Sequence, residues 1–205
     1  MGLPRFSLSS TSGTAEAVGK SQRAHRGQST VEFGLSAVLL LFILLGLIDF
    51  GRAYYFAVGM QSATREGARQ ASWFDPATGT NPYLNDSAIK SAVDAILTNS
   101  GLPASRLQNS STTCPSPSDG NSSYNPPYVA SAYATTDLNQ PLLYICYADT
   151  PGLDLATSPS DNSMKGLGVN VILVMNFGFA SGFMQNALGN SASVAANTAM
   201  TIGGF

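Results

Sequence analysis

The hydrophobic pattern is most uneven near the amino end of the chain. Residues 33–48 carry no charge and consist mainly of Leu, Ile, Val and Phe. As a helix they would measure about 24 Å, somewhat less than the roughly 30 Å hydrocarbon core of a bilayer. Residues 53–60 are again mostly apolar or aromatic. We therefore expect a tilted membrane span over about residues 33–58, with the aromatic residues 54–56 forming an interfacial belt.

Two charged residues interrupt this pattern without ending the helix. Asp49 and Arg52 lie three positions apart on one helix face, where they can pair with each other. The helical pattern continues to about residue 72, and Pro76 disfavours helix beyond residue 75. The sequence thus predicts one long hydrophobic helix over residues 28–72.

Glycine recurs every eight residues in this helix, at Gly51, Gly59 and Gly67. Each glycine costs a helix roughly 1 kcal/mol relative to alanine. Eight residues make about 2.2 helical turns, so the three positions fall on nearby faces. We expect them to allow neighbouring helices to approach closely, with tolerated flexibility as the alternative.

The remaining pattern, over residues 73–205, predicts a small exported domain. Asp86 and Ser87 cap an amphipathic helix that ends at Gly101. Residues 103–127 are dense in Ser, Asn, Pro and Gly, which indicates an irregular loop. Strands are expected over residues 128–135, 142–148, 168–177 and 193–202, with a short helix over residues 179–188.

The third of these strands has an apolar pattern on both faces. Val169, Val171 and Leu173 share one face, and Ile172 and Val174 share the other, so both faces should be covered. The expected fold class is α+β, in which a long N-terminal hydrophobic helix precedes a small antiparallel α+β domain.

The first 27 residues form a polar, basic leader. The segment is rich in Ser, Gly and Thr, and its basic residues, Arg5, Lys20, Arg23 and Arg26, precede the apolar run. This distribution places the amino end in the cytoplasm. A cleaved secretory signal is the competing interpretation, but no small-x-small cleavage pattern follows the apolar run.

Composition and charge narrow the possible chemistry. The chain has 205 residues, a net charge of −2 and only 10 Lys and Arg residues, which argues against nucleic acid as a partner. The single histidine, His25, lies in the leader. Loss of the leader would leave no histidine for a Ser-His-Asp or Cys-His site or for a metal site. No cofactor, metal or small-molecule substrate is evident. Asp149, Asp154 and Asp161 could bind calcium, although solvated loop acids are the favoured interpretation.

The two cysteines, Cys114 and Cys146, are expected to form a disulfide in an exported domain. The bond would close a loop of about 33 residues and stabilise the domain by ~3–4 kcal/mol in the chain-entropy model. Two buried free thiols are the alternative.

A lone carboxylate, Glu32, stands at the front of the apolar run. Ser29 and Glu32 have the spacing of a capping box, which would explain the acid as the start of a helix. Near lipid, however, an unpaired carboxylate costs on the order of 2.5–3.5 kcal/mol. A cut after Gly27 would free an ammonium group on Gln28, and this cation could pair with Glu32 of the same or a neighbouring helix.

These residues resemble a known family. Gly27, Glu32 and Phe33, followed by a hydrophobic helix, resemble the prepilin-peptidase signature of type IV pilins. The continuations Asp-Phe-Gly-Arg-Ala at residues 49–53 and Arg-Glu-Gly-Ala-Arg at residues 65–69 are more specifically similar to TadE-like proteins. Those proteins are minor pilins or pseudopilins of the bacterial tight-adherence (Flp) pilus.

The resemblance implies roles for several of these residues. It implies cleavage between Gly27 and Gln28 by a prepilin peptidase, and a role for Glu32 in subunit registration. Phe33 stands where the family often has Tyr. The charged residues of the two continuations would take part in assembly or set register between subunits, with a solvated face as the alternative for the last three; these residues are Asp49, Arg52, Arg65, Glu66 and Arg69.

The function that the resemblance implies is structural and non-enzymatic. The chain would be a minor pilin or pseudopilin in the assembly of a tight-adherence pilus, anchored in the bacterial inner membrane by a single span. Its carboxyl-terminal domain would be periplasmic or extracellular, and its partners would be the bilayer, other pilins, pilus assembly proteins and the prepilin peptidase. An uncleaved, membrane-anchored assembly factor is the first alternative, and a membrane-tethered enzyme is the second.

Overall fold

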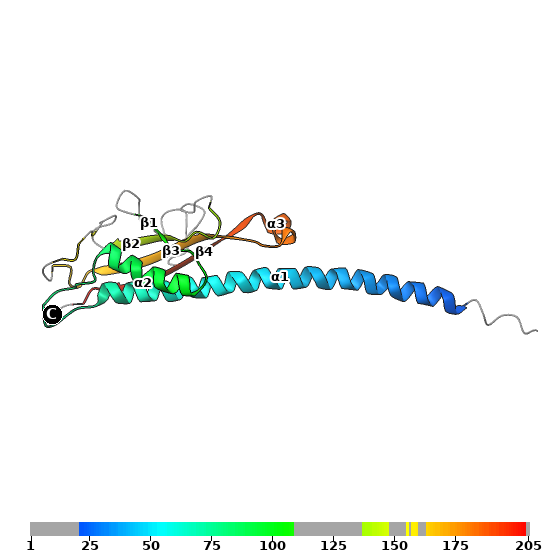
Figure 1. Ribbon diagram of the computed structural model, residues 1–205, viewed down its shortest axis with the longest axis horizontal. Helices are drawn as coiled ribbons and strands as arrows, with labels where there is room; N and C mark the ends of the chain where they lie inside the picture. The colour runs from blue at the N-terminus through cyan, green and yellow to red at the C-terminus, as the bar shows by residue number, and fades with distance from the viewer. Residues whose placement is uncertain (1–20, 109–136, 148–154, 156, 160–162, 204–205) are drawn as a thin grey trace, which may run out of the picture. The chain divides into compact units, whose positions relative to one another are not determined.

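The computed structural model describes residues 21–108, 137–147, 155, 157–159 and 163–203. The chain divides into two compact units, residues 1–44 and residues 45–205. One helix, α1 (Ser21–Ser72), contributes to both units (Figure 1). The prediction of a long N-terminal helix followed by an α+β domain is confirmed.

The start of α1 differs from the expectation. The helix begins at Ser21, upstream of Ser29, and has no acidic residue in its first turn. Ser29 therefore does not cap the start of α1, and Glu32 lies inside the helix. The spacing of a capping box is a local signal, and the helical conformation of the preceding residues makes a cap at Ser29 unnecessary.

The second unit contains a four-stranded sheet. Its strands are β1 (Arg106–Gln108), β2 (Leu142–Tyr147), β3 (Gly168–Gly178) and β4 (Ser191–Thr201), in the order β1-β2-β3-β4. The β2–β3 and β3–β4 pairs are antiparallel, whereas β1 runs parallel to β2. The expectation of a purely antiparallel sheet is therefore wrong in the orientation of one strand.

Strand β1 is also a correction to the expected loop over residues 103–127. It is only three residues long, and its pairing aligns Arg106 with Leu142. The Arg106 amide donates a hydrogen bond to the Pro141 carbonyl at 2.9 Å. A strand this short has no periodic signal, because a partner more than 30 positions away in the sequence creates it. The expected strand over residues 128–135 lies outside the described residues.

Both faces of the sheet are apolar, as the pattern of β3 predicted. The face that carries Val171 and Leu173 belongs to a core cluster that also includes residues of α1 and α2 (Asp86–Asn99). In Figure 1 these two helices lie on the same side of the sheet. The other face carries a second cluster, in which Ile172 and Val174 are fully buried beside Leu142 and Tyr144.

The two shorter helices have clear capping residues. Asn85, rather than Asp86 or Ser87, caps α2, and its side chain accepts a hydrogen bond from the Ala88 amide at 2.8 Å. The helix ends before Gly101, which has a φ of 71°. The other helix, α3 (Gly182–Leu188), lies between β3 and β4 and is shorter than the expected range of 179–188.

The repeated glycines of α1 serve packing within the domain at two of their three positions. A Cβ atom on Gly59 would lie 2.9 Å from the Ser100 side chain, and one on Gly67 would lie 2.6 Å from Cγ2 of Val93. Around Gly51 nothing lies within 4 Å. The expected packing against neighbouring helices is thus replaced at Gly59 and Gly67 by close approach to the chain's own domain.

We expect Gly67→Ala and Gly51→Ala to change stability in opposite directions. The new methyl group at position 67 would overlap Val93, which is fully buried and stiff at χ1. Overpacking of this kind costs about 1–3 kcal/mol, which exceeds the roughly 1 kcal/mol gained from helix propensity. At the open position 51 only the gain remains. Thermal unfolding of the detergent-solubilised chains measures both, and a stabilised Gly67→Ala protein would contradict the packing.

Candidate functional site

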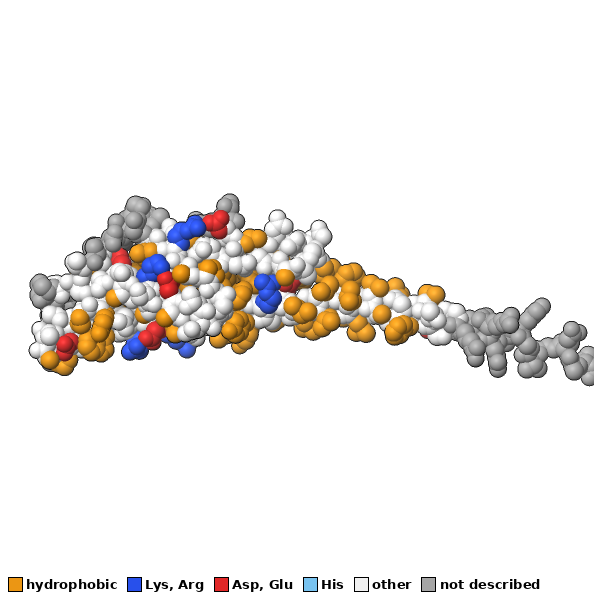
Figure 2. Space-filling view, in the orientation of Figure 1, with side chains coloured by type: hydrophobic (Ala, Val, Ile, Leu, Met, Phe, Trp, Pro, Cys, Tyr) orange, Lys and Arg blue, Asp and Glu red, His pale blue; other side chains and the backbone are white. Residues whose placement is uncertain are grey.

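The amino-terminal part of α1 presents an apolar surface. Residues 27–44 of the first unit are all exposed, including large side chains such as Phe33, Leu35 and Phe42. The helix is long and apolar enough, by length and composition, to cross a membrane. In Figure 2 hydrophobic side chains gather along this segment, whereas most of the Lys, Arg, Asp and Glu side chains that this view shows lie on the second unit.

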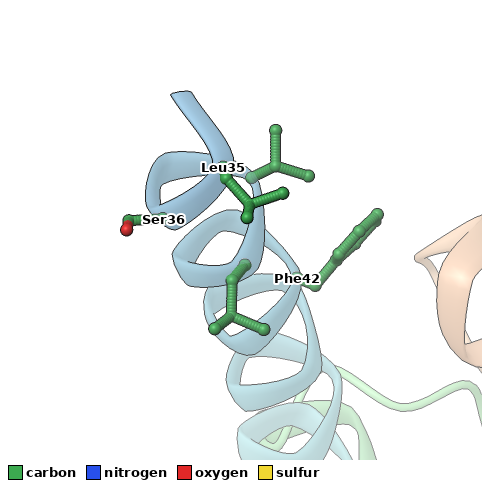
Figure 3. A pocket seen from close by; sticks show the side chains of 5 residues that line it. Leu35, Ser36 and Phe42 are labelled. Atoms are coloured by element: carbon green, nitrogen blue, oxygen red, sulfur yellow. The ribbon is translucent and has the colours of Figure 1, made fainter. Parts of the chain in front are cut away.

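A shallow hollow lies on this apolar surface. It is lined by Leu35, Ser36, Val38, Leu39 and Phe42, all from α1 (Figure 3). Four of them are spaced as positions i, i+3, i+4 and i+7 and so follow one face of the helix. A hollow formed by aliphatic and aromatic side chains of a single helix suits an acyl chain or another apolar helix.

Glu32 and Gln28 lie together on one face of α1. The Gln28 side chain donates from Nε2 to Oε1 of Glu32 at 2.9 Å, across one helical turn, and both residues are exposed. The two residues that the sequence linked through a new amino terminus are therefore neighbours in the uncut chain. Phe33 is also exposed.

From residue 45 on, α1 has a buried stripe and an exposed stripe. The buried stripe faces the domain and includes Asp49, Met60, Ala63 and Ala71. The exposed stripe is apolar or aromatic at positions 47, 50, 54, 55 and 58, and polar or charged at positions 62, 65 and 69. The outward surface of the helix therefore changes from apolar to polar between residues 58 and 62.

Asp49 is fully buried, in the stripe that faces the domain. Its Oδ1 accepts a hydrogen bond from the Ala180 amide at 2.9 Å, and its Oδ2 accepts one from the Ser181 amide at 3.0 Å and a short one from the Ser181 hydroxyl. The carboxylate thereby joins α1 to the start of α3. From the sequence we predicted its pairing with Arg52 and, by the family resemblance, a part in assembly, but not this contact with α3.

That pairing is present but is a smaller part of the contact. Arg52 Nη1 lies 3.4 Å from Oδ1 of Asp49, within one helical turn. The guanidinium also lies over two aromatic rings, 5.3 Å from the centroid of Phe177 and 6.0 Å from that of Phe56. These distances fit cation–π attraction. Asp49 and Arg52 thus hold α1 to the β3–α3 segment within one chain.

The charged motif at residues 65–69 lies on the outer surface. Arg69 donates to Glu66 from Nε at 2.9 Å and from Nη2 at a shorter distance, and Arg65 is exposed. Hydrogen bonding to Arg69 lowers the pKa of the Glu66 carboxyl below its usual value, and the same bond raises the pKa of Arg69. The pair is therefore charged at neutral pH, which gives the outer surface of α1 a fixed charge pattern.

Other candidate residues are only partly described. Cys146 is half-buried in β2, and Cys114 lies outside the described residues, so their disulfide stays a prediction. Asp149, Asp154 and Asp161 also lie outside them. Among the residues that the structure describes, no group of three or more His, Cys, Asp or Glu side chains could hold a metal ion.

Comparison with known proteins finds a family match for part of α1. Residues 27–69 match the family model described as TadE-like protein, which confirms the resemblance seen in the sequence. The match covers the Gly27–Glu32 segment and both charged motifs of α1, and it ends before the sheet. No curated protein and no solved structure matches the chain.

Proposed function

We propose that this chain, whose residues 27–69 match the TadE-like family, is a minor pilin or pseudopilin of a tight-adherence pilus. The match suggests involvement in assembly of this pilus, and the one helix of membrane length among the described residues fits a single-pass membrane protein of a pilus system. The role we propose is structural and non-enzymatic.

The observation that carries the proposal is the exposed apolar surface of α1 beside one acid. Residues 33–44 present Leu, Ile, Val and Phe on every side, a surface that water disfavours and that lipid or apolar helices cover. Glu32 stands at the front of this surface. A helix that moves from a bilayer into a filament needs an apolar surface, because lipid and then neighbouring helices must cover the same side chains. It also needs an acid such as Glu32 that can pair within the filament.

The placement of the helix in the membrane follows from its exposed stripe. Apolar and aromatic residues continue on this stripe through Val58, which supports a span over about residues 33–58. The basic residues before the span favour a cytoplasmic amino end and an exported domain in the periplasm or outside the cell. Lipid and pilus components are the partners that this arrangement fits.

Processing after Gly27 distinguishes a pilin from a permanent anchor. Prepilin peptidase would cut between Gly27 and Gln28, and the new ammonium group would begin one turn before Glu32. A leader that stays attached would instead indicate an anchored assembly factor, the alternative with the same architecture. A membrane-tethered enzyme remains the proposal of another class, and it would require activity that depends on one carboxylate while assembly is intact.

Amino-terminal sequencing of the protein from membranes and from sheared pili tests the proposal. We expect a mature chain that begins at Gln28 and that is present in the pilus fraction. Gly27→Leu should block the cut, whereas Gly34→Leu should not, although a Cβ atom at either position meets nothing within 4 Å. An intact leader in the wild-type protein, with no chain in sheared pili, would contradict the proposal.

A further inference from the structure

Hydrogen bonds hold the tip of the β3–β4 hairpin against α1 at a defined position along the helix axis. Asp49 binds the Ala180 and Ser181 amides, and the Ser181 hydroxyl caps α3 by accepting from the Met184 amide at 3.3 Å. One turn earlier, a Cβ atom on Gly46 would lie 3.8 Å from Sδ of Met184. Helix α3 therefore lies at the level of residues 46–49, at the tip of the hairpin (Figure 1).

Helix α3 exposes apolar side chains at the tip of the hairpin. None of the residues of α3 is buried, and Phe183 and Leu188 are 42% and 65% exposed. A helix of seven residues is too short to be stable in water by itself. Apolar side chains such as Phe183 and Leu188 lose their contact with water when they enter the interface of a membrane.

The charge distribution points to the same environment. No Asp, Glu, Lys or Arg occurs after Lys165, so both strands of the hairpin and α3 are uncharged. A charged side chain that enters the acyl region of a bilayer costs free energy, and this segment carries no charged side chain. The absence of basic residues also indicates that anionic headgroups are not what holds it, so apolar contact is the expected source of binding.

Along the axis of α1, α3 lies beside the carboxyl-terminal end of the apolar run. Residues 33–48 are uncharged, and the aromatic residues Phe50, Tyr54 and Tyr55 follow on the exposed stripe of α1. Aromatic residues of this kind mark the boundary between lipid and water. If α1 spans the membrane as proposed, residues 46–50 lie about one to two turns inside the boundary that Tyr54 and Tyr55 mark, at the outer end of the uncharged part of the span, and α3 lies there with them.

We propose that the tip of the β3–β4 hairpin, residues 179–190, is a second membrane contact of this chain. Its ligand is the interface of the same bilayer that α1 crosses, and Phe183 and Leu188 enter the acyl boundary. The contact holds the exported domain in one orientation on the membrane surface, with Asp49 as the link between the span and the hairpin. The inference rests on the proposed span of α1.

Depth-dependent fluorescence quenching tests this contact in the full chain. The protein has one tryptophan, Trp73, which follows Asp49 by 24 residues, about 36 Å along a helix axis. Three single-tryptophan proteins are reconstituted in phosphatidylcholine vesicles with brominated acyl chains: the wild type, and Phe183→Trp and Phe42→Trp, both in a Trp73→Phe background. We expect brominated lipid to quench Phe183→Trp strongly, with a blue-shifted emission, and to leave the wild type unchanged.

The third protein separates failure of the inference from failure of the span. Position 42 lies within the proposed span, so Phe42→Trp should be quenched whether or not the hairpin touches lipid. Quenching of Phe42→Trp alone, with Phe183→Trp open to aqueous iodide, would overturn the membrane contact and leave the span intact. Loss of quenching in both would overturn the span as well. Leu188→Trp in the same background repeats the measurement at the second apolar side chain.

Discussion

The Asp49→Ala protein is expected to lose about 3 kcal/mol of folding stability in the second unit. The carboxylate accepts three hydrogen bonds from Ala180 and Ser181 in a fully buried position. Removing a buried acceptor costs about 1–3 kcal/mol for each donor that is left unsatisfied. The total is set near the low end because the hairpin tip can rearrange toward solvent.

Thermal unfolding of the detergent-solubilised full chain measures this loss. For a unit of this size, 1 kcal/mol corresponds to about 2–4 °C in Tm, so the midpoint should fall by about 6–12 °C. Hydrogen exchange at the Ala180 and Ser181 amides should also accelerate. Ser181→Ala, which removes the hydroxyl but keeps both amides, should lose less.

Asp137→Ala is the matched control for Asp49→Ala. Asp137 pairs with Arg106 at 3.1 Å, but both side chains are about half exposed. Exposed pairs of this kind contribute little because solvent screens them. If both substitutions lowered the unfolding midpoint equally, the claim that the hydrogen bonds of Asp49 to Ala180 and Ser181 stabilise the second unit would be wrong.

The Glu32→Ala protein is expected to insert in the membrane but to be lost from the pilus. The substitution keeps the apolar surface of α1 and removes the only acid near its front. An unpaired charge near lipid costs on the order of 2.5–3.5 kcal/mol, and a pairing that offsets this cost would favour the filament by about a hundredfold. Glu32→Gln should give the same loss, because it preserves shape and removes only the charge.

Gln28→Ala tests which group of Gln28 pairs with Glu32, the new terminal ammonium group or the side-chain amide. In the uncut chain the Gln28 side chain donates to Glu32 at 2.9 Å, so this local bond is one possible reason for the acid. If the pairing partner is the ammonium group, Gln28→Ala should still enter the pilus. Immunoblots of membrane and sheared-pilus fractions measure all three proteins, with sequencing to show that each is cut. Normal incorporation of Glu32→Ala would refute the assembly role.

The spacing of apolar residues predicted those helices and strands whose pattern lies within one continuous segment of the sequence. The apolar run predicted α1, and the two-sided pattern of Val171 and Ile172 predicted a strand covered on both faces. These predictions succeed because side-chain period and burial are set by the same backbone geometry. The orientation of β1 was missed, because a three-residue strand has no period and takes its direction from a distant partner.

The candidate site shows the same division between local and long-range information. The sequence by itself determined the apolar run, the lone acid Glu32 and the Asp49–Arg52 pair, since each depends on residues within one continuous segment of α1. Only the tertiary structure decided that Asp49 binds Ala180 and Ser181 and that Gly67 packs against Val93. These contacts join residues that lie far apart in the sequence. They depend on how the domain folds against α1, which the spacing of residues along the chain does not predict.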